Sequence, residues 1–242
     1  MTPTEWILLV GLGTWATLDV TAFGQFMVSR AFVSGTLAGA VLGDPVTGAI
    51  VGGILELLFL GNLAVGGVVV PEPGPAAVPA VAVALSAPDA TGGLIALGVA
   101  LGIVWAWVGG RSTVQQRRLN DRVTTRAWAR GGGEGELARA QFTALGLEGL
   151  RGIALTAIGL GVVTLAGIGG IIEFAGARWP LPTPETIALL VLAGLLGLGS
   201  LSGMAASRSG RPDTHRPLIL LGAGLLVGVA LALAITPAGT AS

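Results

Sequence analysis

Apolar residues run without interruption for much longer in the second part of the chain than in the first. Between Asp19 and Glu72 no uncharged run exceeds 15 residues, which is fewer than the roughly 20 residues that a helix needs to cross a membrane. After residue 89, four uncharged runs each reach at least 21 residues. These four runs are Ala90–Gly110, Gly152–Ile172, Thr186–Ser207 and Pro217–Ser242.

This pattern predicts an all-α, polytopic integral membrane protein whose two parts differ in kind. Short, charge-broken segments are typical of re-entrant hairpins or discontinuous helices, and we expect these in residues 1–89, the transport core. Residues 90–110 then form a transmembrane helix, residues 111–151 a cytoplasmic basic helix and loop, and residues 152–242 three further transmembrane helices.

The stretch from Leu42 to Asn62 combines a helix-start signal with small residues at helical spacing. Asp44 before Pro45 favours a helix start, because the carboxylate caps free N–H groups and proline fits the first helical position. Glycines recur every fourth residue on both sides of this point, which predicts two closely packed elements joined there. These glycines are Gly35, Gly39, Gly43, Gly48 and Gly52. Taken alone, they are typical of plain helix packing without a ligand.

Glu56 continues the glycine register, because it follows Gly52 by four residues. A carboxylate at membrane depth is costly and is a functional hypothesis by default, so we take Glu56 as the centre of the candidate site. The other polar residues placed near membrane depth by the pattern are Asp19, Thr21, Gln25, Arg30, Asp44 and Asn62. Carboxylates and amides at this density suit a hydroxyl-rich ligand, although ion or proton coupling would use the same groups.

Each of these polar residues also has a plainer structural role. Asp44 can serve as a helix cap, and Arg30 can neutralise Asp19 or Glu56, since buried charges must be paired. The amide side chains of the set can satisfy the backbone of broken helices. For Glu56 the plain alternative is membership of a structural ion pair.

A proline-rich stretch, Val65–Pro79, follows and contains four prolines and one acid, Glu72. Each proline removes a backbone donor, so a continuous helix is not expected there. Broken backbone at membrane depth is tolerated only inside protein or beside a watery cavity. We therefore expect at least one element within residues 20–80 that does not cross the membrane.

Composition supports a membrane protein without catalytic machinery of its own. The 242 residues are 52% hydrophobic and 11% charged, with a mean hydropathy of +0.83, whereas a soluble domain has about 25% charged residues. The net charge is zero, which argues against nucleic acid as a partner, and the chain has no cysteine. The single histidine, His215, cannot build a metal site alone. No phosphate-binding loop or nucleophile motif occurs, so we expect no cofactor, no metal and no catalytic residue.

Arginine counts predict the orientation. The segment Arg111–Arg151 contains eight arginines and four acids, whereas Glu173–Glu185 contains one arginine and two acids. The positive-inside rule places the first segment in the cytoplasm and the second outside. The basic part of the first segment, which we expect Gly131 to terminate, either faces lipid headgroups or docks a cytoplasmic partner.

The residues from Asp19 to Pro73 resemble the membrane component C (IIC) of the mannose/fructose/sorbose family of sugar phosphotransferase permeases. The match starts with the series Asp19, Gln25 and Ser29–Arg30. It continues with GxxxGxxLGD at Gly35–Asp44, GxxxGGxLEL at Gly48–Leu57, Gly61, Gly66–Gly67 and a proline-rich segment with Glu72. The matching series covers about a quarter of the chain; the remainder agrees in length and hydropathy only.

The resemblance implies a sugar-translocating subunit in the cytoplasmic (inner) membrane. It implies a second membrane component D (IID), cytoplasmic components A and B (IIA and IIB) that carry the phosphohistidine, and a homo-oligomer within a larger complex. It also implies a C component that holds most of the sugar site and moves in an elevator-like manner. By motif, the expected substrate contacts are Asp19, Gln25, Glu56 and Asn62.

Two positions depart from the family pattern. Arg30 is followed by alanine where the family has Arg-Pro, and Pro71-Glu72-Pro73 stands where a Pro-Pro-Asp-like run is common. These departures leave room for a carrier that is uncoupled or coupled to a cation, with Glu56 as the coupling carboxylate. A third interpretation is a non-transporting scaffold or sensor subunit that docks a cytoplasmic protein.

Overall fold

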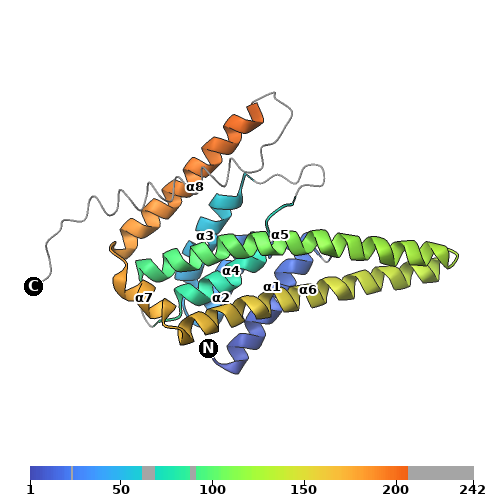
Figure 1. The fold of residues 1–242 in the computed structure, drawn as a ribbon, viewed down its shortest axis with the longest axis horizontal. Helices are drawn as coiled ribbons and strands as arrows, with labels where there is room; N and C mark the ends of the chain where they lie inside the picture. The colour runs from blue at the N-terminus through green and yellow to red at the C-terminus, as the bar shows by residue number, and fades with distance from the viewer. Residues whose placement is uncertain (23, 62–68, 88–90, 207–242) are drawn as a thin grey trace, which may run out of the picture.

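The computed structural model describes residues 1–22, 24–61, 69–87 and 91–206, and within these ranges the chain forms eight helices and no strand (Figure 1). The helices are α1 (Pro3–Thr21), α2 (Ala31–Leu42), α3 (Pro45–Phe59), α4 (Pro73–Ala84), α5 (Gly92–Ala129), α6 (Glu134–Ile168), α7 (Ile171–Arg178) and α8 (Thr183–Ala206). The all-α fold class is confirmed. Asn62, His215 and the predicted span Pro217–Ser242 lie outside the described residues.

α2 and α3 form a tight hairpin around residues 43 and 44. Gly43 ends α2 in the left-handed conformation, with φ of +94°, which glycine adopts without steric cost. Asp44 then begins α3, because its Oδ1 accepts hydrogen bonds from the backbone N–H groups of Val46 and Thr47, both at 3.0 Å. Pro45 occupies the first turn, where no helical N–H is needed.

The glycines of α2 and α3 lie where the two helices touch. A Cβ atom built on Gly35 would lie 2.8 Å from Gly52 Cα, and one built on Gly39 would lie 2.8 Å from Gly48 Cα. Both separations are shorter than any real Cβ contact, so no side chain fits between the backbones. The hairpin is therefore held together by direct backbone contact.

Substituting Gly39 with alanine is expected to lower the free energy of unfolding by about 1–3 kcal/mol, because the two helices must move apart to admit the methyl group. Gly146→Ala is the matched control, since a Cβ atom there meets nothing within 4 Å in the interior of α6. There the change should stabilise by about 0.5–1 kcal/mol. Thermal unfolding in detergent measures both, and equal melting temperatures would contradict the close-contact account.

The helices differ in whether they are long enough to cross a membrane. α2, α3 and α4 have 12, 15 and 12 residues, so each is at most about 23 Å long and shorter than a hydrocarbon layer of about 30 Å. α5 and α6 have 38 and 35 residues and are the two helices in the described ranges that are long and apolar enough to cross a membrane. α4 lies against α2 and α5 and is buried over nearly its whole length.

α5 and α6 continue as unbroken helices through residues 110–111 and 151–152, where the sequence pattern predicts domain boundaries. Beyond the other helices the pair extends as a helical arm, residues 111–151, that turns back at residues 130–133 (Figure 1). The turn uses Gly131 and Gly132, both with positive φ. The basic segment is thus continuous with the two apolar helices.

Candidate functional site

The loop between α1 and α2, described over residues 24–30, is held by Asp19. This side chain is 1% exposed, and its Oδ1 accepts a hydrogen bond from Phe26 N at 2.5 Å. Its Oδ2 accepts from Ser29 N at 3.0 Å and from Ser29 Oγ at 2.9 Å. Both carboxylate oxygens are thus occupied by the loop, which makes Asp19 an organiser of this loop. Its expected contact with substrate stays a prediction.

The same loop adopts an unusual backbone conformation. Gln25 and Met27 have φ values of +53° and +67° without being glycine. Such residues are held in place by their surroundings and cluster at functional sites. The Gln25 side chain is exposed on this loop, where it is free to reach a ligand, and Phe26 lies edge-on to Trp15.

Glu56 forms an ion pair with Arg30, between Oε1 and Nη2. The Arg30 side chain is 49% exposed and the Glu56 side chain 18% exposed. The second oxygen, Glu56 Oε2, is buried and has no hydrogen-bond partner within the described ranges. A buried carboxylate oxygen without a donor is costly, so Glu56 retains an acceptor for a hydroxyl group or a cation.

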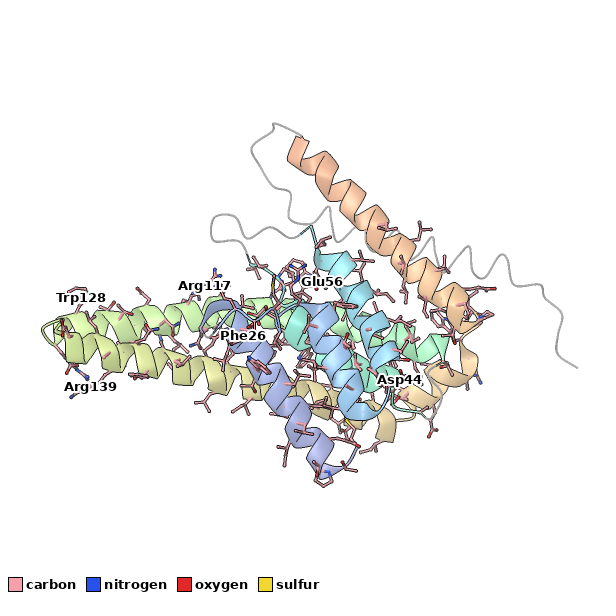
Figure 2. The ribbon with its side chains drawn as sticks, turned by 180° about the vertical axis from the view of Figure 1, so that it is seen from behind. Phe26, Asp44, Glu56, Arg117, Trp128 and Arg139 are labelled. Atoms are coloured by element: carbon pink, nitrogen blue, oxygen red, sulfur yellow. The ribbon has the colours of Figure 1, made fainter. Side chains whose placement is uncertain are left out.

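Glu56 and Asp44 lie at opposite ends of the α2–α3 hairpin (Figure 2). Asp44 is fully used in starting α3, since its Oδ2 also accepts from Thr47 Oγ1 at 2.6 Å. Arg30 precedes α2 and Glu56 lies near the end of α3, so both belong to the open end of the hairpin. The structure thus gathers Arg30, Glu56 and the Asp19-held loop at one end and leaves Asp44 at the other.

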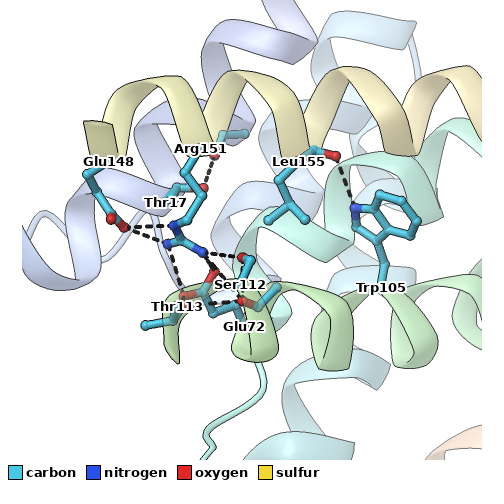
Figure 3. A network of polar contacts seen from close by, with 10 residues as sticks. Thr17, Glu72, Trp105, Ser112, Thr113, Glu148, Arg151 and Leu155 are labelled. Atoms are coloured by element: carbon cyan, nitrogen blue, oxygen red, sulfur yellow. Dashed lines mark hydrogen bonds and ion pairs between the residues drawn. The ribbon is translucent and has the colours of Figure 1, made fainter. Parts of the chain in front are cut away.

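A second polar cluster, which the sequence analysis did not assign to a site, joins three elements around Arg151 on α6 (Figure 3). Its Nη1 donates to Glu72 Oε2 at 2.9 Å and to Ser112 Oγ at 2.8 Å. Its Nη2 donates to Glu72 Oε1 at 3.1 Å and to Glu148 Oε1 at 2.5 Å. Thr113 on α5 donates a further hydrogen bond to Glu72.

We call this cluster the Arg151 network: Glu72, Ser112, Thr113, Glu148 and Arg151. It is nearly buried, with 9% of the Arg151 side chain exposed. It ties the start of α4 to the point where α5 and α6 leave the body as the arm. The i, i+3 spacing of Glu148 and Arg151 was a visible signal in the sequence, whereas their pairing with Glu72 was not.

A cavity of about 230 Å³ lies beside this network. Its wall is mostly apolar and is built from the end of α1, the segment before α4, and α5. The polar side chains that line it are Ser29, Glu72, Thr113 and Arg117. Among the described residues, no three His, Cys, Asp or Glu side chains come together as metal ligands.

A protein-family model described as "PTS system sorbose-specific IIC component" matches residues 5–167, about two thirds of the chain. The chain belongs to this IIC family. It is also 35% identical over 77 residues to the mannose-specific EIIC components of the phosphotransferase system from Escherichia coli K12 and Shigella flexneri. The aligned part is 32% of this chain and only 29% of the length of those relatives.

A solved structure titled "Structure of membrane protein" has the same fold. It superposes with a TM-score of 0.64 at 23% identity and covers 96% of this chain and 95% of its own. The match to the family model confirms the family resemblance found in the sequence. The matched region contains both the hairpin and the Arg151 network, so the two clusters belong to the IIC part of the chain.

Proposed function

We propose that this IIC component binds a hexose-like sugar within the membrane at the open end of the α2–α3 hairpin and delivers it to a cytoplasmic phosphorylating component. The observation that carries the proposal is Glu56 Oε2, which is buried and has no hydrogen-bond partner among the described residues. A carboxylate accepts hydrogen bonds from neighbouring sugar hydroxyls, and the half-exposed Arg30 beside it supplies donors for sugar oxygens. Gln25 on the adjacent loop offers both a donor and an acceptor.

The α2–α3 hairpin can carry such a site as a rigid unit. Its two helices touch through backbone at the glycines, so they cannot slide past each other without losing that contact. Neither helix is long enough to cross the membrane alone, which supports a re-entrant hairpin with Glu56 at membrane depth. Elevator-like movement of the core against the long helices α5 and α6 is part of the proposal.

The proposed setting is the cytoplasmic (inner) membrane, with several passes through the lipid bilayer. The proposed partners are component D (IID) in the membrane and components A and B (IIA and IIB) in the cytoplasm. A homo-oligomer within that complex completes the arrangement. The family name supports these partners, because phosphotransferase systems divide transport and phosphate transfer among components.

The alternative is an uncoupled or cation-coupled carrier. Glu56 Oε2 is compatible with cation coupling, since a carboxylate at membrane depth also suits an ion or proton. These proposed functions can be distinguished by measuring the uptake of radiolabelled mannose with and without the cytoplasmic phosphotransfer proteins. Dependence on those proteins supports phosphorylation-linked transport. Uptake without them supports the uncoupled or cation-coupled carrier, and no uptake in either condition supports a scaffold or sensor subunit.

Labelling of single introduced cysteines is expected to show that the arm lies in the cytoplasm. Gly133→Cys lies at the tip of the arm, where a Cβ atom meets nothing within 4 Å, and the chain has no native cysteine. This variant should react with an impermeant maleimide only after the cells are permeabilised, because arginine-rich segments remain inside. The control is Glu173→Cys in the segment assigned to the outside, which should react in intact cells. Labelling of Gly133→Cys in intact cells would invert the proposed topology.

A further inference from the structure

The arm carries a row of arginines on its surface. Arg118, Arg122 and Arg126 follow one another at intervals of four residues on α5, so they lie along one side of the helix. All three are exposed, whereas Gln116 and Ala127 are the buried residues of this part of α5. We call Arg118, Arg122 and Arg126 the arginine stripe. None of the three forms an ion pair within the part of the chain that the structure describes.

The acids of the arm do not neutralise the arginine stripe. Asp121 is the one acid in residues 111–130; it forms no ion pair with any described residue, and its charge offsets at most one of the three arginines. On α6, Glu136 and Glu148 pair with arginines outside the stripe. Glu134 lies in the first turn of α6, at the tip of the arm. The stripe therefore keeps an excess of positive charge.

This row of like charges opposes the stability of the arm itself. Arginines four residues apart on a helix repel each other, whereas a glutamate and an arginine at the same spacing attract. A helix face that only contacts water gains nothing from such a row, but carboxylates of a second molecule would remove the repulsion. Leu119 precedes Arg122 by three residues and so lies on the same side, with 40% of its surface exposed. Protein interfaces combine arginine with apolar contacts in this way.

The direction of α5 keeps the stripe away from lipid. The helix has no proline and runs unbroken from Gly92 to Ala129. Its uncharged part, residues 92–110, is about 28 Å long, close to the hydrocarbon thickness of about 30 Å. The stripe lies about 12–24 Å further along the same axis, beyond a headgroup layer of about 5–8 Å. A helix that keeps its direction (Figure 1) does not lie flat on the bilayer, so the stripe faces the aqueous cytoplasm.

We propose that the arginine stripe is a docking surface for an acidic face of a soluble cytoplasmic protein. The inference rests on the proposed function, under which that protein is the phosphorylating component B (IIB). The Arg151 network joins the base of the arm to the start of α4, so a protein bound at the stripe is held next to the transport core. Arginine suits this role, because its planar guanidinium donates two parallel hydrogen bonds to one carboxylate.

Binding of purified, fluorescently labelled component B of the same phosphotransferase system to the full-length chain in phosphatidylcholine nanodiscs tests the stripe. Changing all three stripe arginines to glutamine should weaken this binding about tenfold or more, since three charged contacts are lost. Changing them to lysine keeps the charge and should retain most of the affinity. Raising the salt concentration from about 50 to about 200 mM should weaken binding to the parent chain, because salt screens exposed charges.

The matched control removes three other exposed arginines of the arm, Arg117, Arg130 and Arg139, by the same change to glutamine. The net charge of the arm falls equally in both triple variants, but the control leaves the stripe intact. The affinity for component B should therefore stay close to that of the parent chain. Equal losses in the two triple variants would reduce the effect to general electrostatics and overturn the inference.

The outcomes separate this inference from the proposed sugar site. Mannose binding by the same nanodiscs without any binding of component B overturns the inference alone. Binding of component B that depends on the stripe, without mannose binding, overturns the sugar site alone.

A fluorophore on Thr125→Cys, an exposed position between Arg122 and Arg126, tests the placement away from lipid. Brominated phosphatidylglycerol in the nanodisc should not quench it, and strong quenching would assign the stripe to lipid headgroups and overturn the inference.

Discussion

Replacing Arg151 with methionine is expected to lower the free energy of unfolding by about 3–5 kcal/mol, the usual cost of removing one partner from a buried ion pair. Methionine fills much of the volume but leaves two carboxylates without their cation. The side chains of Glu72 and Glu148 are only 11% and 8% exposed, so water cannot replace the lost hydrogen bonds. Denaturation in detergent, followed by circular dichroism or intrinsic fluorescence, measures the change.

The matched control is Arg139→Met on the same helix. Arg139 pairs with Glu136 at the same i, i+3 kind of spacing, but its side chain is 79% exposed, and exposed pairs contribute about 0–1 kcal/mol. A double change of Glu72→Gln with Arg151→Met should recover part of the loss, because one buried charge disappears. Similar losses for Arg151→Met and Arg139→Met would show that the Arg151 network does not hold α4 to the arm.

The fold class was readable from the sequence because it depends on local pattern and composition. Long uncharged runs, prolines and glycines at helical spacing act over one or two turns, and they led to an all-α membrane protein with a tight turn at Asp44. The ends of α5 and α6 were less predictable. The charges along the arm indicate that the chain passes from an apolar to an aqueous environment, but they do not end a helix. Arginine and glutamine are good helix formers, so the helices continue through residues 110 and 151.

Ion pairs between residues far apart in the chain could not be predicted from the sequence. Arg30 had two possible partners, Asp19 and Glu56, and local pattern does not choose between them. The structure pairs Arg30 with Glu56, because the loop of residues 24–30 occupies both oxygens of Asp19. Glu72 and Arg151 are 79 positions apart, and only the packing of α4 against α6 brings them together.

A second large effect, on sugar affinity, is expected when Glu56 is replaced by glutamine. Glu56→Gln keeps the volume and one acceptor but removes the charge, and each lost charge-assisted hydrogen bond to a sugar hydroxyl is worth about 1.5–3 kcal/mol. Sugar affinity should therefore fall about tenfold or more. Folding should be little affected, because Arg30 is 49% exposed and water can solvate it when its partner becomes neutral.

Glu136→Gln serves as the control for the loss of one carboxylate elsewhere. Glu136 lies on the arm, where it pairs with Arg139 and faces no part of the proposed site. Its substitution removes the same charge from the protein, so general electrostatic effects should appear equally in both variants. Only Glu56→Gln should change sugar affinity.

The most direct test of the sugar site is the affinity for mannose measured beside the melting temperature, in detergent, for the parent chain, Glu56→Gln and Glu136→Gln. A sugar site at Glu56 predicts similar melting temperatures for all three proteins and weaker mannose binding, by about tenfold or more, in Glu56→Gln alone. Unchanged mannose affinity in a stably folded Glu56→Gln would contradict it and remove Glu56 from the site.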